Sequence, residues 1–581
     1  MDNYFLGLDL STQQIKALVF DKHGRFVTQQ AVCFDSELPQ YGTDSGRIIK
    51  ESNKVVSPVL LWVDALDLIF SKLRENLGGH MSNIVAIGGS AQQHGSVYWR
   101  GFEEIELSQK EPLSQQLARE QIFTILDSPT WEDSSTTEYC KQLHSKHSPE
   151  LVAYITGSVA YERFTGNQIE KIKNENPNEY SQTERISLIS SFLGSLLIGK
   201  YAPIEVSDGS GMNLLDVQTR KWSTVLCDSE LLSKLGPDPI FAGEKIGNIH
   251  PYYVTKYGIN KDCIISSITG DNPGGLLFVE SLPSSHKEKE KEKTTLLISL
   301  GTSDTVIFSN DDYPYSGLNK DKMAHDRGFE YGHVLSHPCN SDKWATLLCY
   351  KNGSLARKWV CDRMLLNTSG NKILSETEKW NKFEEKIACN SQVSSEYGFY
   401  YILPEIIPKA SGVFRFAEKK SNEIGDSIDI DGTSFCETSS GYRISGVDAK
   451  LIVESQIMSM LIDIKRKGID IKNDIKNIIV TGGASSNKSL LQTIADVFNN
   501  DVYEIEVVKS EQEKYCISSL SMPALGGAVC AFKCYNDEGN SILSQFKVVN
   551  INSASQDMVE YYRCKIKKFE ILRDLIERKF N

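Results

Sequence analysis

Long hydrophobic runs are absent from this chain of 581 residues. No apolar stretch reaches the roughly 18 residues that a membrane-spanning helix needs, so we expect no membrane segment. The first residues, Met1–Tyr4, also lack the basic region and the apolar core of a signal peptide. These absences favour a cytoplasmic protein over a membrane-bound or secreted one.

Paired cysteines are missing as well. The 13 cysteines form no C-x-x-C motif and show no spacing typical of metal ligands. Scattered cysteines of this kind indicate free thiols in a reducing compartment, which again fits the cytoplasm.

An excess of basic residues is also lacking. The chain has 63 Lys and Arg against 76 Asp and Glu, which gives a formal net charge of −13. Surfaces that bind nucleic acid are positively charged, so a nucleic-acid partner is not expected. A hydrophobic content of 40% and a charged content of 24% are typical of soluble globular proteins. The negative net charge does not exclude a local basic pocket for a nucleotide.

What the sequence does contain is two similar patterns of strand, polar turn and strand. The first runs from Phe5 to Asp21 with a polar tip at Asp9–Gln14, and the second runs from Leu296 to Phe308 with Gly301, Thr302 and Ser303 at its tip. Backbone N–H groups and hydroxyls in a tight turn bind anions, and Asp9 is placed to hold a hydrated Mg²⁺. The alternative is a pair of ordinary hairpins. Their recurrence favours an internally duplicated chain that binds a polyphosphate.

A second candidate region follows the buried strand predicted at 83–87. It contains Gln92, Gln93 and His94 among glycines. Side chains at the carboxyl end of a buried strand face a crevice in α/β folds, so these groups are candidates to bind a polar small molecule. Arg163 is a further candidate because guanidinium offers several N–H donors. A structural role for His94 and a surface ion pair for Arg163 remain alternatives.

Asp271 stands where another predicted strand, 263–268, gives way to a helix. A carboxylate at such a position is well placed for general acid–base chemistry. The competing interpretation is a helix cap, a common role for Asp and for its neighbour Asn272.

A true P-loop is absent. Residues 482–489 approach the pattern G-x-x-x-x-G-K-S, but Asn487 replaces the second glycine. The order of strand, glycine turn and helix still favours a nucleotide at Gly482 and Gly483. Two further helices are predicted, one over 343–364 and a long amphipathic one over 447–465. The charged segment 287–293 and the polar segment 418–442 are expected to be exposed, with no function assigned.

Taken together, these motifs resemble the FGGY family of carbohydrate kinases, and within it the eukaryotic members that act on D-xylulose. The resemblance covers nearly the whole chain and rests on Leu8–Gln14, Ser57–Leu60, Gln92–Ser96, Glu162–Gln168, Asp208–Asn213, Thr269–Pro273, Ser299–Thr305 and Thr481–Ser485. It implies an α/β, two-lobed actin-like ATPase (ribonuclease H-like) fold in which each lobe is a mixed β-sheet with flanking helices. It also implies a sugar-binding lobe at 1–285 and an ATP-binding lobe at 286–581.

The resemblance further implies the role of each candidate residue. Asp271 would be the general base that takes the proton of the 5-hydroxyl of D-xylulose, and Asp9 would position Mg²⁺ through water. The sugar-binding residues implied are His94, Arg163, Asp271 and Asn272. The ATP-binding residues implied are Thr12, Gly301, Thr302, Ser303, Trp380, Gly482, Gly483 and Asn487. Many family members carry Gly where Ser11 stands, so the first phosphate loop is expected to differ slightly in shape.

The reaction implied is ATP-dependent phosphorylation of D-xylulose to D-xylulose 5-phosphate by a monomer or homodimer. Two alternatives stay open. One is a related kinase that acts on ribulose, glycerol or another polyol, and the other is a non-catalytic sugar sensor on the same fold. An intact Asp271 argues against the sensor, because a binding protein has little use for a base at that position. Fold alone does not decide between them.

Overall fold

The structure, a computed structural model, describes most of the chain and divides it into two compact units. Unit 1 comprises residues 1–287, 309–346 and 507–547, and unit 2 comprises 288–308, 347–506 and 548–581. Two later segments thus return to unit 1, and the assignment of a sugar lobe and an ATP lobe stays a prediction. The residues described are 2–102, 107–282, 293–315, 332–366, 374–389, 395–419, 427–438, 443–510, 513–516, 520–536 and 542–580.

Some predictions fall outside these ranges. Residues 287–292 of the charged segment and two parts of the polar segment, 420–426 and 439–442, lie outside the described residues. Among the described helices, none combines the length and the apolar character that crossing a membrane requires. The cysteines that the structure describes are free thiols.

The main sheet of unit 1 is built on the first predicted hairpin. The strands lie in the order β13-β14-β6-β1-β2-β3, and β15 pairs with the end of β6. β1 is antiparallel to β2 and parallel to β6. The predicted hairpin is therefore confirmed, although Asp9 lies in strand β1 and not in the turn. The strand bounds are β1 Tyr4–Leu10, β2 Gln14–Asp21, β3 Phe26–Cys33, β6 Ile84–Ala91, β13 Lys245–Asn248, β14 Ile264–Ser266 and β15 Thr269–Gly270.

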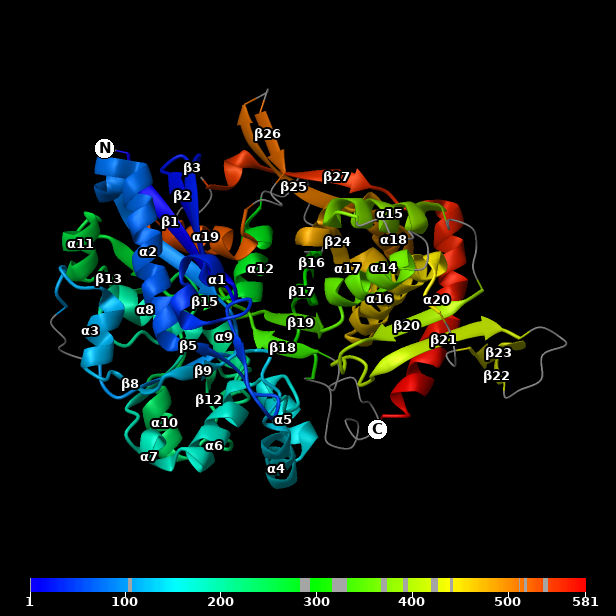
Figure 1. Ribbon diagram of the computed structural model, residues 1–581, viewed down its shortest axis with the longest axis horizontal. Helices are drawn as coiled ribbons and strands as arrows, with labels where there is room; N and C mark the ends of the chain where they lie inside the picture. The colour runs from blue at the N-terminus through cyan, green and yellow to red at the C-terminus, as the bar shows by residue number, and fades with distance from the viewer. Residues whose placement is uncertain are drawn as a thin grey trace. The chain divides into compact units, whose positions relative to one another are not determined.

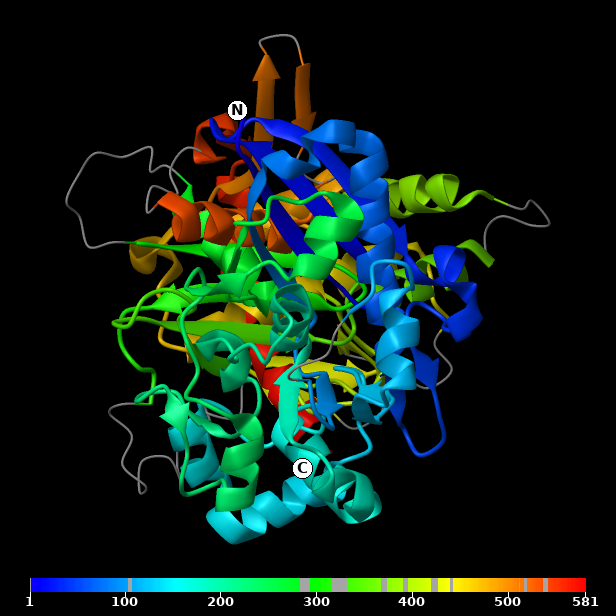
Figure 2. The ribbon, with the colours of Figure 1, turned by 90° about the vertical axis from the view of Figure 1, so that its left-hand side faces the viewer.

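Side chains of β1 alternate between two layers of helices. Leu6, Leu8 and Leu10 join a large core with helices α2 (Val59–Leu77) and α8 (Ile189–Ile198). Figures 1 and 2 both show α2, in blue, beside the strands of the first hairpin. The intervening positions Phe5, Gly7 and Asp9 face helix α19 (Met522–Asn536). Phe5 and Gly7 contact α19 itself, and Asp9 contacts Ser521, the residue before it.

Helix α19 lies unusually close to the sheet because glycines line the contact. A Cβ on Gly7 would lie 2.0 Å from the carbonyl oxygen of Ala524, and one on Gly88 would lie 2.2 Å from that of Gly527. Helix α12 (Asp271–Ser281) meets α19 in the same way, since a Cβ on Gly526 would lie 1.9 Å from the oxygen of Gly274. Only glycine permits these approaches, and they bring the start of α19 to the end of β1.

The remaining elements of unit 1 form three small sheets and short helices around the main sheet. The small sheets have the orders β10-β7-β8, β4-β5-β9 and β11-β12. The strands of these small sheets are β4 Ile48–Ile49, β5 Val55–Pro58, β7 Ser96–Trp99, β8 Phe123–Ile125, β9 Asp127–Pro129, β10 Arg185–Leu188, β11 Leu215–Asp216 and β12 Lys221–Trp222. Strand β18 (His333–Ser336) belongs instead to a separate, eight-stranded sheet. The helices are α1 Phe34–Glu37, α3 Leu113–Arg119, α4 Thr137–His147, α5 Pro149–Thr156, α6 Thr165–Glu175, α7 Pro177–Ser181, α9 Val206–Ser210, α10 Ser229–Leu235 and α11 Pro251–Tyr257.

Unit 2 repeats the strand arrangement of unit 1 around the second predicted hairpin. Strand β16 (Thr294–Leu300) is antiparallel to β17 (Asp304–Asn310) and parallel to β24 (Ile475–Thr481). β24 in turn is parallel to β25 (Val502–Ser510). The second hairpin is therefore confirmed, with Gly301–Ser303 as its tip.

The other elements of unit 2 are a four-stranded sheet and several longer helices. That sheet has the order β20-β21-β23-β22. The strands are β19 Trp344–Tyr350, β20 Tyr397–Tyr401, β21 Gly412–Glu418, β22 Ile428–Ile430, β23 Thr433–Glu437 and β27 Phe546–Asn552. The helices are α14 Ser354–Leu366, α15 Glu376–Cys389, α16 Gly446–Arg466, α17 Ile471–Asp474, α18 Lys488–Phe498 and α20 Gln556–Glu577.

One predicted element is wrong in its first half. The predicted helix within 343–364 is strand β19 followed by helix α14. The apolar and aromatic residues of 344–350 fit a buried strand, and Asn352 and Gly353 separate it from the helix. The long helix predicted over 447–465 is confirmed as α16.

Candidate active site

In unit 1, the candidate residues gather where three strands end side by side. Register places Asp9 of β1 opposite Ser90 of β6, and Thr269 of β15 opposite the same Ser90. The residues that follow β6 and β15 in the chain include His94 and Asp271. The carboxyl ends of parallel strands meet at one edge of a sheet, which is where α/β folds bind ligands.

Asp9 is a buried carboxylate with hydroxyl partners on both oxygens. Its exposed fraction is 1%. Ser11 Oγ donates to Oδ1 at 2.6 Å, and Ser521 Oγ donates to Oδ2 at 2.6 Å. The second donor stands just before α19 and reaches Asp9 because of the glycine contacts described above. Sequence reasoning did not single out Ser521, which is 512 residues from Asp9 in the chain.

A magnesium ion at Asp9 would have few protein ligands. Within the described residues, no group of three or more His, Cys, Asp or Glu side chains could hold a metal ion. Mg²⁺ usually keeps several waters and binds through one or two carboxylates and substrate phosphates, and a single carboxylate fits that manner of binding.

Thr12 lies in the turn of the first hairpin, and its hydroxyl already has partners. Trp131 Nε1 donates to Thr12 Oγ1 at 3.0 Å, and Thr12 Oγ1 donates to Gln92 Oε1 at 3.4 Å. A Cβ on Gly46, which has a positive φ of 77°, would lie 1.9 Å from the carbonyl oxygen of Thr12. These contacts fix the conformation of the turn.

His94 and Arg163 are in contact with each other and are nearly buried. Both have exposed fractions of 7%. Arg163 Nε donates to His94 Nε2 at 3.3 Å, so the proton of the neutral imidazole sits on Nδ1 and is donated to the carbonyl oxygen of Gly211 at 3.0 Å. Burial, and then the positive charge of Arg163, lower the pKa of His94 to about 3. His94 is therefore neutral at physiological pH.

A histidine that the sequence did not single out completes this group. Nη2 of Arg163 lies 2.6 Å from Nε2 of His333, and guanidinium can only donate, so His333 accepts. His333 is fully buried, and its ring packs against Tyr161 and Phe164. No local pattern predicts this contact, because His333 is 170 residues from Arg163 in the chain.

Asp271 is the first residue of α12 and is not its cap. The N-cap is Gly270, which forms no side-chain cap hydrogen bond. Oδ1 of Asp271 instead accepts from the backbone N of Asn272 at 2.8 Å and from its Nδ2 at 3.0 Å. Asn272 Nδ2 also donates to Gln93 Oε1 at 3.2 Å. The helix-cap interpretation is thus wrong for Asp271.

The environment of Asp271 shifts its acidity. Burial, and then the neighbouring negative charge of Asp9, raise the pKa of Asp271 to about 7. Asp208, buried and bonded to Ser190 Oγ, also has its pKa raised, to about 8, chiefly by burial. A carboxylate with a pKa near 7 is a stronger base than an ordinary aspartate and is still ionised in part at neutral pH.

In unit 2, the candidate nucleotide residues lie at the ends of β16 and β24. Ser299 pairs with Thr481, and a Cβ on Gly482 would lie 2.5 Å from the carbonyl oxygen of Leu300. Gly482 has a positive φ of 95°, which only glycine adopts freely. The structure therefore brings Gly482 and Gly483 next to the tip Gly301–Ser303.

Asn487 and Trp380 belong to two helices that pack against each other, α18 and α15. Asn487 is the N-cap of α18, and its side-chain oxygen accepts from the backbone N of Leu490 at 2.9 Å. Trp380 is partly exposed on α15, which packs against α18, and its ring lies 5.5 Å from that of Phe383. Neither residue is enclosed, so both remain open to a ligand.

Known proteins resemble this chain over most of its length. The profile described as "FGGY family of carbohydrate kinases, N-terminal domain" matches residues 119–277. The chain is 38% identical to "Xylulose kinase" of Rattus norvegicus, covering 87% of this chain and 85% of that protein. It is 34% identical to "Xylulose kinase" of Schizosaccharomyces pombe, covering 92% and 90%. The chain therefore belongs to the FGGY family of carbohydrate kinases.

Solved structures confirm the fold class predicted from the sequence. The crystal structure of xylulose kinase from Rhodospirillum rubrum superposes with a TM-score of 0.73 over the whole of both chains, at 12% sequence identity. The α/β, actin-like ATPase fold with a mixed sheet and flanking helices in each unit is thus established for this chain.

Proposed function

We propose that this carbohydrate kinase transfers the γ-phosphoryl group of ATP to the 5-hydroxyl of D-xylulose, forming D-xylulose 5-phosphate. The observation that carries the proposal is the 38% identity to a protein named xylulose kinase over 85% of that protein's length. Residues that the reaction needs are present in unit 1 with suitable chemistry. A kinase for ribulose or glycerol is less well supported, because the relatives compared above carry the name of the xylulose enzyme.

Asp271 is the proposed general base. Phosphoryl transfer depends mainly on positioning and charge stabilisation, and a base assists by accepting the proton of the attacking hydroxyl. The raised pKa of Asp271, about 7, favours that role. Asn272 holds one oxygen of the carboxylate, so Oδ2 is the oxygen proposed to receive the proton.

His94, Arg163 and Asn272 are proposed to bind the sugar together with Asp271. The contact between His94 and Arg163 fixes the orientation of both side chains. The neutral imidazole avoids charge repulsion with Arg163, and the guanidinium supplies hydrogen-bond donors suited to sugar hydroxyls.

ATP is proposed to bind through two sets of backbone-rich turns. Thr12 and the tip Gly301, Thr302 and Ser303 would contact phosphate groups, while Gly482, Gly483, Asn487 and Trp380 would surround the adenosine. Mg²⁺, held through water near Asp9, would neutralise phosphate charge. The protein is further proposed to act in the cytoplasm as a monomer or homodimer, with no nucleic-acid partner.

The proposal is tested by measuring ADP release with D-xylulose, D-ribulose and glycerol. D-xylulose should give the highest kcat/KM, and chelation of Mg²⁺ with EDTA should abolish turnover. A higher kcat/KM for either other acceptor would replace the proposed substrate. Absence of ADP release with any of the three would contradict the proposed function itself.

A further inference from the structure

Directly behind the tip Gly301–Ser303 lies a buried polar network that the reaction scheme does not use. Its centre is Asp304, the first residue of β17, whose side chain is 1% exposed. Arg357 of α14, 2% exposed, binds it in bidentate fashion, with Nη1 to Oδ2 at 2.7 Å and Nη2 to Oδ1 at 3.0 Å. Two parallel bonds of this kind fix direction as well as distance.

The Asp304 carboxylate also lies beside the tip. Strand pairing places Asp304 opposite Leu300, the residue before Gly301. Burial raises the pKa of Asp304, while Arg357 and the backbone N–H of Gly301 favour its ionised form. Arg357 neutralises the charge and holds both oxygens in one plane. Arg357 therefore sets the orientation of the carboxylate beside the tip.

A second set of contacts to the tip comes from Gly353 and Ser354. Ser354 N donates to the carbonyl oxygen of Gly301 at 2.9 Å. A Cβ on Gly353 would lie 2.8 Å from the carbonyl oxygen of Thr302 and 2.7 Å from Asp304 Oδ1, so the chain at Gly353 lies against the tip without a gap. The segment 352–354 is thus a support for the tip.

Gln456 of α16 connects the two sets of contacts. Its Oε1 accepts from Arg357 Nη1 at 2.8 Å, and its Nε2 donates to the carbonyl oxygens of Asn352 at 2.5 Å and Gly353 at 3.1 Å. One amide side chain therefore couples the guanidinium to the supporting segment.

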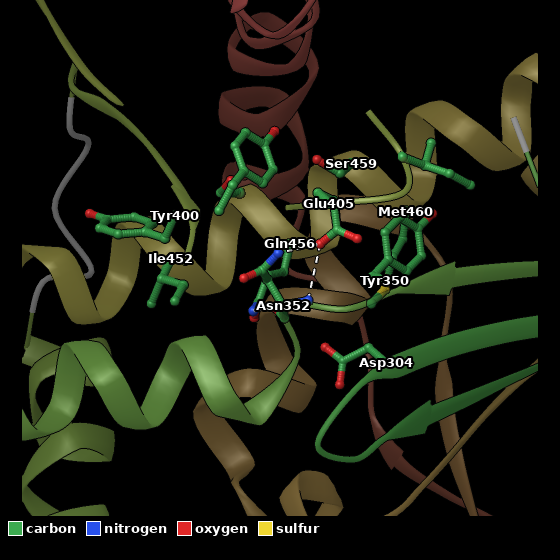
Figure 3. Close-up of a pocket in the computed structure, with 12 residues that line it drawn as sticks. Asp304, Tyr350, Asn352, Tyr400, Glu405, Ile452, Gln456, Ser459 and Met460 are labelled. Carbon is green, nitrogen blue, oxygen red and sulfur yellow. Dashed lines mark hydrogen bonds between the residues drawn. The ribbon is translucent and has the colours of Figure 1, made fainter. Parts of the chain in front are cut away.

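Glu405 accepts hydrogen bonds from two residues of the supporting segment or next to it, Lys351 and Asn352. Its Oε2 accepts from Asn352 Nδ2 at 2.8 Å and from Asn352 N at 3.0 Å, and Oε1 accepts from Lys351 N at 2.8 Å. Figure 3 shows Asn352, Gln456 and Glu405 pointing toward one another, with Asp304 on the adjoining strand. These residues border a cavity of about 30 Å³, which has room for water but not for a sugar or a nucleotide.

We infer that Arg357 and Gln456 are positioning residues for the phosphates of ATP. They act through Asp304 and the 352–354 segment to hold the backbone N–H groups and hydroxyls of Gly301–Ser303 in a phosphate-binding conformation. Neither side chain needs to touch the nucleotide. The inference rests on the proposed function only in taking this tip as a phosphate-binding turn.

The test compares Arg357→Lys and Gln456→Leu with a control at an equally buried ion pair. Lysine keeps the charge but cannot form two parallel bonds, and leucine keeps the approximate size of glutamine without its hydrogen bonds. The control is Arg573→Lys, because Arg573 and Asp463 form a 0% exposed pair, 2.6 Å apart, that also involves α16. That pair has no contact with the tip among those described here.

The affinity for MgATP is measured by calorimetry. The affinity for adenosine is measured by the ability of adenosine to displace bound ADP. Arg357→Lys should weaken MgATP binding by about tenfold or more and leave adenosine affinity within about twofold. Gln456→Leu should give the same pattern at about three- to tenfold. Arg573→Lys should lower thermal stability without changing either affinity. These measurements do not require turnover, so they stand even if D-xylulose is not the acceptor.

Two outcomes would overturn the inference. One is an equal loss of MgATP and adenosine affinity in Arg357→Lys, which indicates general damage to unit 2. The other is unchanged MgATP affinity in both Arg357→Lys and Gln456→Leu. Should Arg357→Lys fail to fold, Gln456→Leu alone decides, since removal of the Gln456 amide leaves the two bonds of the Asp304–Arg357 pair in place.

Discussion

The two halves of the molecule contain the same three-strand arrangement with an aspartate beside the turn. In unit 1, β1 is antiparallel to β2 and parallel to β6, and Asp9 stands just before the turn. In unit 2, β16 is antiparallel to β17 and parallel to β24, and Asp304 stands just after the turn. The exposed fraction is 1% for Asp9 and 0% for Asp304.

The two aspartates differ in what they bind. Asp304 is paired with a guanidinium, so its charge is neutralised within the fold. Asp9 accepts from two neutral hydroxyls, and its charge contributes to the raised pKa of Asp271. A buried carboxylate beside a polar turn is therefore not in itself a sign of chemistry. Its partners decide whether the charge serves the architecture or acts on a ligand.

The largest effect is expected at the proposed base. Asp271→Asn removes the proton acceptor and keeps the size of the side chain. We expect kcat to fall about 10²–10⁴-fold, the usual contribution of a general acid–base group. Affinity for D-xylulose, measured by calorimetry without nucleotide, should change little. Near-normal turnover would remove Asp271 from the base role.

Asp304→Asn is expected to act mainly on stability. It leaves Arg357 buried without its charge partner, and breaking a buried pair in this way costs about 3–5 kcal/mol in the free energy of unfolding. Urea denaturation measures that loss, with Asp463→Asn at the Arg573 pair as the matched control. The pH dependence of residual turnover should match that of the unchanged protein. A shifted pH dependence would mean that Asp304, like Asp9, acts on the reacting groups.

Arg163→Lys tests whether the sugar contacts are confined to unit 1. Arg163 bridges His94 and His333 through two different nitrogens, which lysine cannot do. We expect KM for D-xylulose to rise about tenfold, or about 1.4 kcal/mol, while KM for ATP stays within twofold. Steady-state kinetics with each substrate varied in turn measures both values. Equal increases in the two KM values would contradict the proposal that Arg163 binds the sugar and not ATP.

Much of the fold could be predicted from the sequence because its signals are local. The alternation of apolar and polar residues around Asp9–Gln14 and around Gly301–Ser303 indicates hairpins, and both hairpins are present. Only the first half of the predicted helix over 343–364 is wrong, because an apolar run of seven residues fits either a strand or a helix until its neighbours are known.

The partners of the candidate residues could not be predicted in the same way. Ser521 donates to Asp9 across 512 residues of chain, and Arg357 reaches Asp304 across 53. No periodic pattern links such positions, since the packing of α19 on the sheet and of α14 beside β17 brings them together. The residue types at strand ends predict where chemistry would take place, but they do not predict which carboxylate a guanidinium neutralises.

The smallest predicted effect is the sharpest test of the comparison. Asp271 must be ionised to accept a proton, so kcat/KM for D-xylulose should rise with pH through about 7 and level off above it. Asp9→Asn removes a like charge, which makes ionisation of Asp271 easier. The rise should therefore move to lower pH by about one unit or less, equivalent to about 1.4 kcal/mol at most.

Because the substitution also removes the proposed magnesium ligand, a ¹³C NMR titration of the Asp271 carboxyl, assigned with Asp271→Asn, gives the same pKa without turnover. Asp304→Asn in that titration should leave the pKa where it was, and a shift toward higher pH in Asp9→Asn would show that the hydroxyl-bound aspartate is not the charge that Asp271 senses.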